Sequence, residues 1–331
     1  MLKNWKEHAK KANTEHMTGL SEINKEKIRK FFLGSKDKEG FLKLFIVYAL
    51  LICIGFVYLY PLLYMISNSF MNLDDLLDTS INWIPSTLAI SNYFQAAGSM
   101  DFWPSLGKSI IIAGVPTLIN VSIGAIVGYG FGRFDFKGKN IMMGLLIFSF
   151  ILPSQITMMP TYVLYSDLKI LGSLKAFIYP ALLAQGINAP IFILIFYQFF
   201  KQVPKVLLEA AQIDGAGYFK SFLRISIPSA APAILTVFLF SFVWYWNESY
   251  LTELYVCGLF KDSAWTTLVV ELKNFATNYT AYQTTGNTAS NINESIQMAG
   301  TMLSILPVLL MYFVLQRYFV ESIDRTGITG E

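Results

Sequence analysis

Six long apolar segments constrain the fold of this chain more than any other feature of its sequence. They cover roughly residues 41–66, 107–131, 140–163, 174–199, 229–250 and 297–319. A helix needs about 20 apolar residues to cross the hydrocarbon core of a bilayer, and each segment is long enough. Hydrophobic residues make up 54% of the 331, and the mean hydropathy is +0.48. These values are far from those of a soluble domain, so the sequence predicts an all-α integral membrane protein with six transmembrane helices.

The positions of the basic residues predict how these helices are oriented. If the N-terminus is cytoplasmic, the inner segments are 1–43, 132–139, 200–228 and 316–331, and they hold 20 of the 25 Lys and Arg residues. Cytoplasmic loops of membrane proteins carry an excess of Lys and Arg, so both termini are predicted to be cytoplasmic. The expected organisation is a basic N-terminal tail (1–40), a transmembrane domain (41–319) and a C-terminal tail (320–331).

The few cysteines and histidines leave little room for metal chemistry or disulfides. Cys53 lies in an apolar segment and Cys257 in a loop, a pattern that matches neither a disulfide framework nor a metal site. His8 and His16 both lie in the polar N-terminal tail. The net charge of +3 is small and bears on orientation in the membrane, so nucleic acid is not an expected partner. We expect this chain to bind no cofactor and no metal.

A charged stretch, residues 202–228, separates the fourth and fifth apolar segments and must lie outside the hydrocarbon. Pro204 suits the first turn of a helix, and 205–212 contains good helix formers. Asp214 and Gly215 then favour a turn, and a second helix is expected over roughly 217–224. This predicts a helix-turn-helix on the cytoplasmic side. An ordinary amphipathic connector and a docking site for another protein both remain open from this pattern alone.

A resemblance favours the docking site. Residues 209–232, EAAQIDGAGYFKSFLRISIPSAAP, resemble the EAA coupling loop of bacterial ABC importer permeases. The likeness is to the carbohydrate-uptake permeases similar to the smaller membrane subunit of the maltose transporter, and it implies the type I importer fold. It assigns ATPase coupling to Glu209, Ala210, Ala211, Asp214, Gly215, Ala216, Phe219, Ile225 and Pro228. The stretch 128–140, GYGFGRFDFKGKN, also resembles the family, with Gly130 and Gly132 where alanine is usual.

The resemblance also implies partners. No G-x-x-x-x-G-K-[ST] phosphate loop occurs in the chain, so ATP and Mg²⁺ are expected to be used by a partner ATPase and not here. The family implies two ATPase copies, a second related permease subunit, and an extracellular or periplasmic sugar-binding protein. The substrate would be an oligo- or disaccharide, and the location a bacterial cell membrane. The C-terminal stretch 316–330 resembles the family's tail that reaches the ATPases, although Thr329 replaces the usual lysine.

Breaks and small residues inside the apolar segments have separate explanations. Pro153 and Pro160, with Gln155 between them, predict a break in the third segment, which is tolerated where backbone is buried in protein or faces water. Pro180 and Pro190 predict the same in the fourth segment. In the second segment small residues recur every four positions and favour close helix packing rather than chemistry: Gly124, Gly128 and Gly132.

Aromatic and polar residues end the fifth segment in the order Trp246, Asn247 and Glu248. They are typical of an aromatic belt at the membrane interface. The alternative is a substrate pathway, in which Trp246 offers an aromatic face to a sugar ring and Asn247 and Glu248 hydrogen-bond its hydroxyls, with Gln155 as a further candidate. The external loop that follows, 251–296, is long, and its part 274–296 is rich in Asn, Thr and Ser. It is either a docking site for a binding protein or a flexible insertion.

Three alternatives compete with a sugar importer. An ABC permease for another solute remains open because no motif marks the substrate-facing residues. A stand-alone six-helix channel or carrier would transport without ATP. A membrane enzyme is disfavoured, because the chain lacks H-E-x-x-H, G-x-S-x-G and an intramembrane pair of Asp residues. The expected protein is therefore a non-catalytic transport subunit.

Overall fold

The computed structural model describes residues 34–35, 38–78, 80, 83–257, 265–286 and 291–327. It divides into two compact units, Met1–Met65 and Ile66–Glu331. Most of the predicted N-terminal tail, 1–33 and 36–37, lies outside the described residues, as do residues 328–331 of the C-terminal tail.

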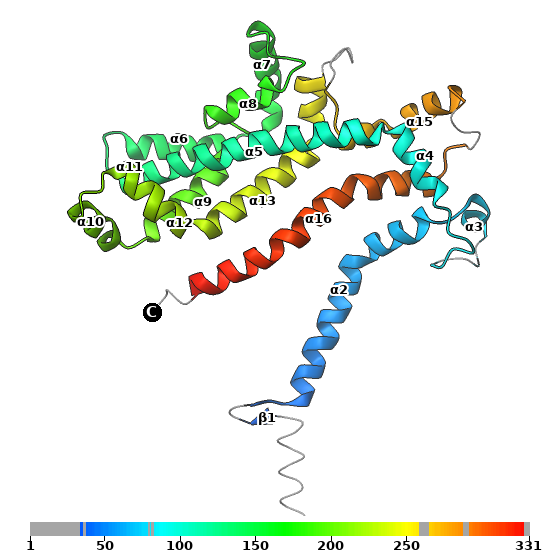
Figure 1. Cartoon of the computed structure of the whole chain (residues 1–331), viewed down its shortest axis with the longest axis horizontal. Helices are drawn as coiled ribbons and strands as arrows, with labels where there is room; N and C mark the ends of the chain where they lie inside the picture. The colour runs from blue at the N-terminus through cyan, green and yellow to red at the C-terminus, as the bar shows by residue number, and fades with distance from the viewer. Residues whose placement is uncertain are drawn as a thin grey trace, which may run out of the picture. The chain divides into compact units, whose positions relative to one another are not determined.

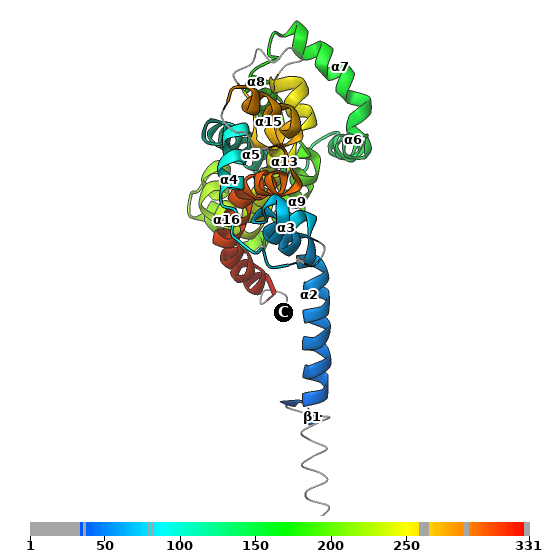
Figure 2. The same cartoon turned by 90° about the vertical axis from the view of Figure 1, so that its right-hand side faces the viewer.

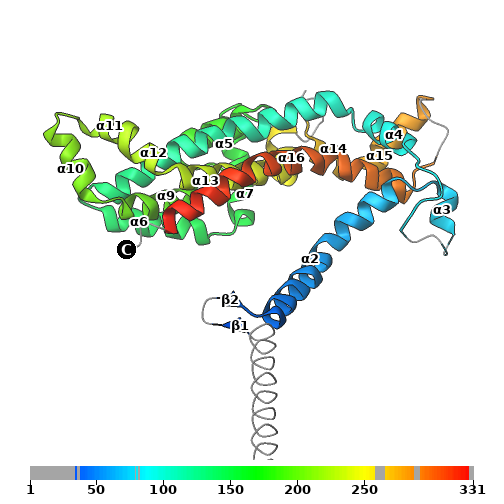
Figure 3. The same cartoon turned by 60° about the horizontal axis from the view of Figure 1, so that its bottom comes forward.

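The described part of the first unit consists of a short strand pair and most of an apolar helix. Strands β1 (Gly34–Ser35) and β2 (Lys38–Glu39) pair antiparallel, and α2 (Phe41–Ser69) follows at once, as Figure 3 shows. At 1.5 Å per residue α2 is about 44 Å long, enough to cross a bilayer. Pro61 lies within it. Apart from this strand pair, the regular elements of the described residues are all helices, which confirms the predicted all-α class.

The second unit contains the remaining helices (Figure 1). In chain order they are α3 (Leu73–Leu77), α4 (Ser91–Ser99), α5 (Phe102–Arg133), α6 (Lys139–Ile151), α7 (Ser154–Asp167), α8 (Lys175–Leu182), α9 (Ala189–Gln202), α10 (Lys205–Ile213), α11 (Tyr218–Ser221), η1 (Phe222–Ser226), α12 (Ile227–Ser229), α13 (Ala231–Asn247), η2 (Thr252–Cys257), α14 (Leu268–Lys273), α15 (Phe275–Thr284) and α16 (Glu294–Gly327). The elements η1 and η2 are π-helical. Helix α5 packs along α9 and α13, and α13 packs on α16.

The predicted small-residue face of α5 is confirmed as the surface that meets α9. A Cβ atom placed on Gly128 would lie 2.5 Å from the Cβ of Phe196 and 2.9 Å from the backbone nitrogen of Tyr197. On Gly132 it would lie 3.2 Å from the Cβ of Phe200, and on Gly124 3.4 Å from the ring of Phe196. Glycine at these positions lets the two backbones of α5 and α9 approach closely.

Every predicted apolar segment coincides with helix, but not all are single helices. Helices α2 and α5 and residues Glu294–Tyr318 of α16 are each long and apolar enough to cross a membrane. Three more spans are possible if bent helix pairs count as one each. One pair is α6 and α7, which meet at 100° (Figure 2). The break falls at Leu152 and Pro153, as predicted, whereas Pro160 lies inside α7 without ending it.

The break in the fourth segment, residues 183–188 between α8 and α9, is held by buried polar groups from α5 and α13. The side-chain amide of Asn120 donates to the carbonyl oxygen of Ile187 at 3.3 Å and to the hydroxyl of Ser241 at 3.4 Å. The backbone N–H of Ile187 donates to the hydroxyl of Tyr245 at 3.1 Å. The N–H and the carbonyl oxygen of Ile187, in the break between two helices, are thereby satisfied.

The predicted external loop contains packed structure in its described part. Helices α14 and α15 form, and Phe275 and Tyr279 of α15 are almost fully buried. The hydroxyl of Tyr279 donates to the side-chain oxygen of Gln95 on α4 at 2.7 Å. The alternative that this region is only a flexible insertion is therefore wrong for 265–286, because its aromatic residues belong to the core. Residues 258–264 and 287–290 of the loop lie outside the described part.

Candidate functional site

Helix α10 ends in a turn that only glycine adopts without strain. Gly215 has a φ of +80°, in the left-handed region. The N–H of Gly215 donates to the carbonyl of Gln212 at 3.0 Å, and that of Ala216 donates to the carbonyl of Ala211 at 2.8 Å. These two bonds form a Schellman motif, which satisfies carbonyls at the end of a helix. The turn predicted at Asp214 and Gly215 is thus confirmed.

The segment from Lys205 to Ser229 is called the hairpin below. Its return half includes a π-helix and the short helix α12 before the chain enters α13. Helix α11 passes into η1, which ends just before Pro228. Proline has no N–H, and its ring clashes with the carbonyl four residues earlier, so the normal α-helical bonding fails there. The second predicted helix is therefore present but irregular.

A buried aromatic side chain anchors the hairpin to α5 and α9. Phe222 is 7% exposed, and its ring centroid lies 4.7 Å from that of Tyr129 on α5 and 6.2 Å from that of Phe200 on α9. Tyr129 lies in the stretch 128–140, and its contact with the hairpin joins positions too far apart for a local pattern to indicate.

The outer surface of the hairpin is apolar and carries a carboxylate. Val206, Ile213 and Phe219 are 70%, 87% and 72% exposed. Glu209 is exposed beside Ala210, and it makes no ion pair with any residue that the structure describes. An exposed apolar patch of this kind commonly marks a contact with another protein. Of the nine predicted coupling residues, six are exposed and three are partly buried, the latter being Ala211, Ala216 and Ile225.

The predicted substrate-pathway residues lie in differing environments. Trp246 is 3% exposed, and its indole N–H donates to the carbonyl of Ser304 on α16 at 3.3 Å. Glu248 is partly buried, and its carboxylate accepts the N–H of Leu251 at 2.9 Å. Asn247, the last residue of α13, is exposed, and so is Gln155 on α7. Trp246, Asn247 and Glu248 therefore gather at one helix end, with Gln155 on a different element.

The thiol of Cys257, at the end of η2, is buried and free. Burial raises the pKa of this thiol to about 11. The thiolate is the reactive form, so Cys257 stays protonated and unreactive near neutral pH. Within the described ranges, no group of three or more His, Cys, Asp or Glu side chains could hold a metal ion.

Long apolar helices, breaks within apolar segments and an exposed charged hairpin are typical of a multi-pass membrane protein. The chain belongs to the family described as binding-protein-dependent transport system inner membrane component, which matches residues 120–325. It is therefore a transport permease.

Two transport permeases are similar to this chain in sequence, and one solved structure is similar to it in fold. The arabinooligosaccharides transport system permease protein AraQ of Halalkalibacterium halodurans is 30% identical, over 84% of this chain and 93% of the relative. The polygalacturonan/rhamnogalacturonan transport system permease protein YtcP of Bacillus subtilis is 27% identical, over 86% of this chain and 97% of the relative. A bacterial ABC transporter involved in the import of the acidic polysaccharide alginate has a similar fold. Its TM-score is 0.69 at 22% identity, over 83% of this chain and 96% of that one.

Proposed function

We propose that the chain is one membrane subunit of an ATP-driven, binding-protein-dependent importer for oligo- or disaccharides. The observation that carries the proposal is the hairpin, whose exposed surface combines Glu209 with apolar side chains in a permease that has no phosphate loop of its own. The substrate class is supported by the relatives, whose names describe transport of arabinooligosaccharides and of polygalacturonan or rhamnogalacturonan.

The hairpin is proposed to couple the permease to an ATPase that binds ATP and Mg²⁺. Glu209 would pair with a basic side chain of the ATPase, while Ala210 and Ala211 allow a close approach. Phe219 would contribute apolar contact area. Asp214, Gly215, Ala216, Ile225 and Pro228 would fix the shape of the turn and of the return segment. ATPases of this kind act as pairs, so a second permease subunit with its own hairpin would complete the transporter, and a binding protein would deliver the saccharide.

The proposed topology has six transmembrane helices in a bacterial cell membrane, with both termini in the cytoplasm. The distribution of Lys and Arg supports it, because it places the hairpin on the same side as the basic N-terminal tail. The transmembrane domain would span residues 41–319 between tails 1–40 and 320–331.

Asn247 and Gln155 are the proposed solute contacts among the predicted pathway residues. Both are exposed in the isolated chain, whereas the indole N–H of Trp246 is engaged by α16. Trp246 and Glu248 would shape the end of α13 on which Asn247 stands.

Reconstitution in liposomes tests this function. With the second permease subunit, the ATPase and the loaded binding protein, we expect saccharide uptake that requires internal ATP and this chain. The isolated chain should transport nothing. Uptake by the isolated chain without ATP would instead identify a stand-alone carrier, and a binding protein that delivers only non-sugar solutes would refute the substrate class.

A further inference from the structure

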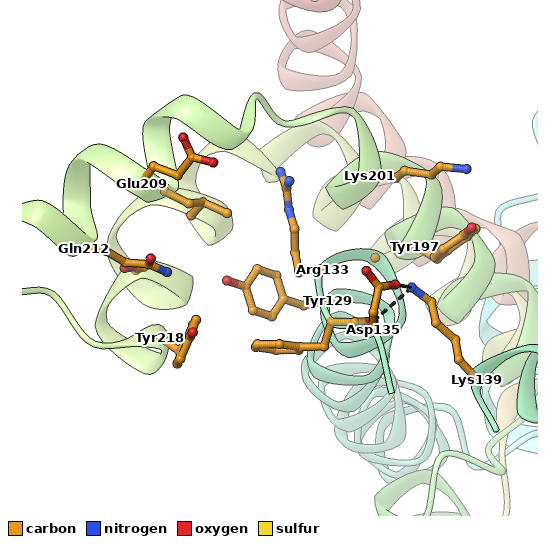
Figure 4. A pocket seen from close by; sticks show the side chains of 13 residues that line it. Tyr129, Arg133, Asp135, Lys139, Tyr197, Lys201, Glu209, Gln212 and Tyr218 are labelled. Atoms are coloured by element: carbon orange, nitrogen blue, oxygen red, sulfur yellow. Dashed lines mark hydrogen bonds and ion pairs between the residues drawn. The ribbon is translucent and has the colours of Figure 1, made fainter. Parts of the chain in front are cut away.

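A pocket of about 490 Å³ lies between the hairpin and the ends of α5 and α9 (Figure 4). Helix α10 contributes Glu209 and Gln212 to its wall, α11 contributes Tyr218 and Ser221, and α5 contributes Tyr129 and Arg133. Glu209 belongs both to this wall and to the exposed surface of the hairpin, so the pocket borders that surface.

Two buried donors in the wall have no partner. The Nη2 of Arg133 donates to the carbonyl oxygen of Val203, but its Nε is buried without a hydrogen-bond partner. Ser221 is 2% exposed, and its hydroxyl is buried and equally unpartnered. A buried polar group without a partner is expensive, so a ligand that reached both donors would stabilise this wall.

Tyr129 supplies a third donor. Its side chain is 7% exposed, with its ring centroid 5.3 Å from that of Phe200, and Figure 4 shows its hydroxyl directed into the pocket. No hydrogen bond of this hydroxyl is found among the described residues. The aromatic packing fixes the ring, so the hydroxyl is held in place for a ligand.

The charges at the pocket favour an anion. Lys139 is neutralised by Asp135, whose carboxylate lies 3.0 Å from its ammonium group. Arg133 and Lys201 form no ion pair with any described residue, and the Lys201 ammonium lies 5.7 Å over the ring of Tyr197. They outweigh the one remaining carboxylate, that of Glu209, so the pocket carries a net positive charge.

We propose that this pocket binds a phosphate group, from a soluble phosphate ester or from the headgroup of an anionic phospholipid. Phosphate oxygens accept from several donors at once, and a guanidinium group is well suited to binding them. The Nε of Arg133 and the hydroxyls of Ser221 and Tyr129 would each donate to it. Occupation of the pocket would brace the hairpin against α5.

This site would also regulate coupling, a consequence that rests on the proposed function. An ATPase residue paired with Glu209 would neutralise the carboxylate that is otherwise unpaired at the pocket and repels the anion. By reciprocity of linked binding, phosphate would then strengthen the docking of the ATPase by the same factor. The binding of phosphate itself does not require an ATPase.

The test measures phosphate binding to the full-length chain in phosphatidylcholine nanodiscs. Calorimetric titration with glycerol 3-phosphate examines the soluble source, and native mass spectrometry of bound lipid after addition of phosphatidylglycerol examines the headgroup. Binding in either arm supports the site and identifies its source. Binding in neither arm overturns it.

Three variants separate the site from general electrostatics. Tyr129→Phe removes only the hydroxyl, and we expect affinity to fall about tenfold. Arg133→Gln should reduce it further. Lys137→Gln removes the same charge from an exposed residue outside the pocket and should leave binding unchanged. Equal weakening by Arg133→Gln and Lys137→Gln, with no effect of Tyr129→Phe, would contradict the proposal. Binding that persists with no effect on ATPase docking would refute only the coupling.

Discussion

Replacing Gly128 by alanine is expected to reduce the amount of folded protein severely, although it adds a single methyl group. That methyl group would lie 2.5 Å from the Cβ of Phe196 and 2.9 Å from the backbone nitrogen of Tyr197. Neither atom can move without moving α9. Overpacking of this kind costs about 1–3 kcal/mol, and a contact with backbone places the substitution at the upper end. Thermal unfolding in detergent and the yield of monodisperse protein measure the effect.

The same helix supplies graded controls. Gly132→Ala should be milder, because its new Cβ would lie 3.2 Å from the nearest atom, and Gly124→Ala milder still at 3.4 Å. Gly130→Ala meets nothing within 4 Å and should be neutral or slightly stabilising, since alanine is the better helix former by about 1 kcal/mol. If Gly130→Ala destabilises the protein as much as Gly128→Ala, the close approach of α5 to α9 is not what the glycines provide.

A β-branched residue at Gly215 should uncouple ATP hydrolysis from transport while leaving the protein folded. The φ of +80° is unfavourable for any residue with a Cβ, and strain of this kind costs about 1–3 kcal/mol. Relief of that strain would break the Schellman turn and displace Glu209 from its partner. We expect Gly215→Val to lower the stimulation of ATPase activity by loaded binding protein about tenfold, because 1.4 kcal/mol corresponds to a factor of ten.

Gly217→Val is the matched control in the same turn. A Cβ meets no atom within 4 Å at either glycine, so steric contact does not distinguish the two positions. Gly217 has a φ of −69°, which valine adopts readily, and this variant should remain coupled. Normal coupling in Gly215→Val, or equal loss in both variants, would show that the left-handed turn is not what transmits the motion.

The features that sequence predicts well here are those set by nearby residues. The helix after Pro204, the turn at Gly215 and the break at Pro153 each depend on the conformational preferences of one or two residues, and all three are present. The glycine face of α5 was also predicted, because a spacing of four places the residues on one side of a helix.

Features that depend on distant pairs escape such reasoning. Nothing near Trp246 indicates that its indole N–H reaches Ser304, which lies 58 positions away. The burial of Phe275 and Tyr279 was missed because the surrounding sequence is rich in polar residues typical of loops. The phosphate pocket combines α5, α9 and the hairpin, and the buried donors of Arg133 and Ser221 become noticeable only once their surroundings are known.

The most direct test of this account asks what touches Glu209 in the assembled importer. A photoreactive p-benzoylphenylalanine at position 209 of the full-length chain, irradiated in cells, is predicted to cross-link to a protein that mass spectrometry identifies as an ATPase with a phosphate loop. The same group at position 94, exposed on α4 and predicted to be extracellular, should give no such product. Absence of an ATPase cross-link at position 209, or an equal one at position 94, would contradict the claim that the hairpin is where the permease receives energy from ATP.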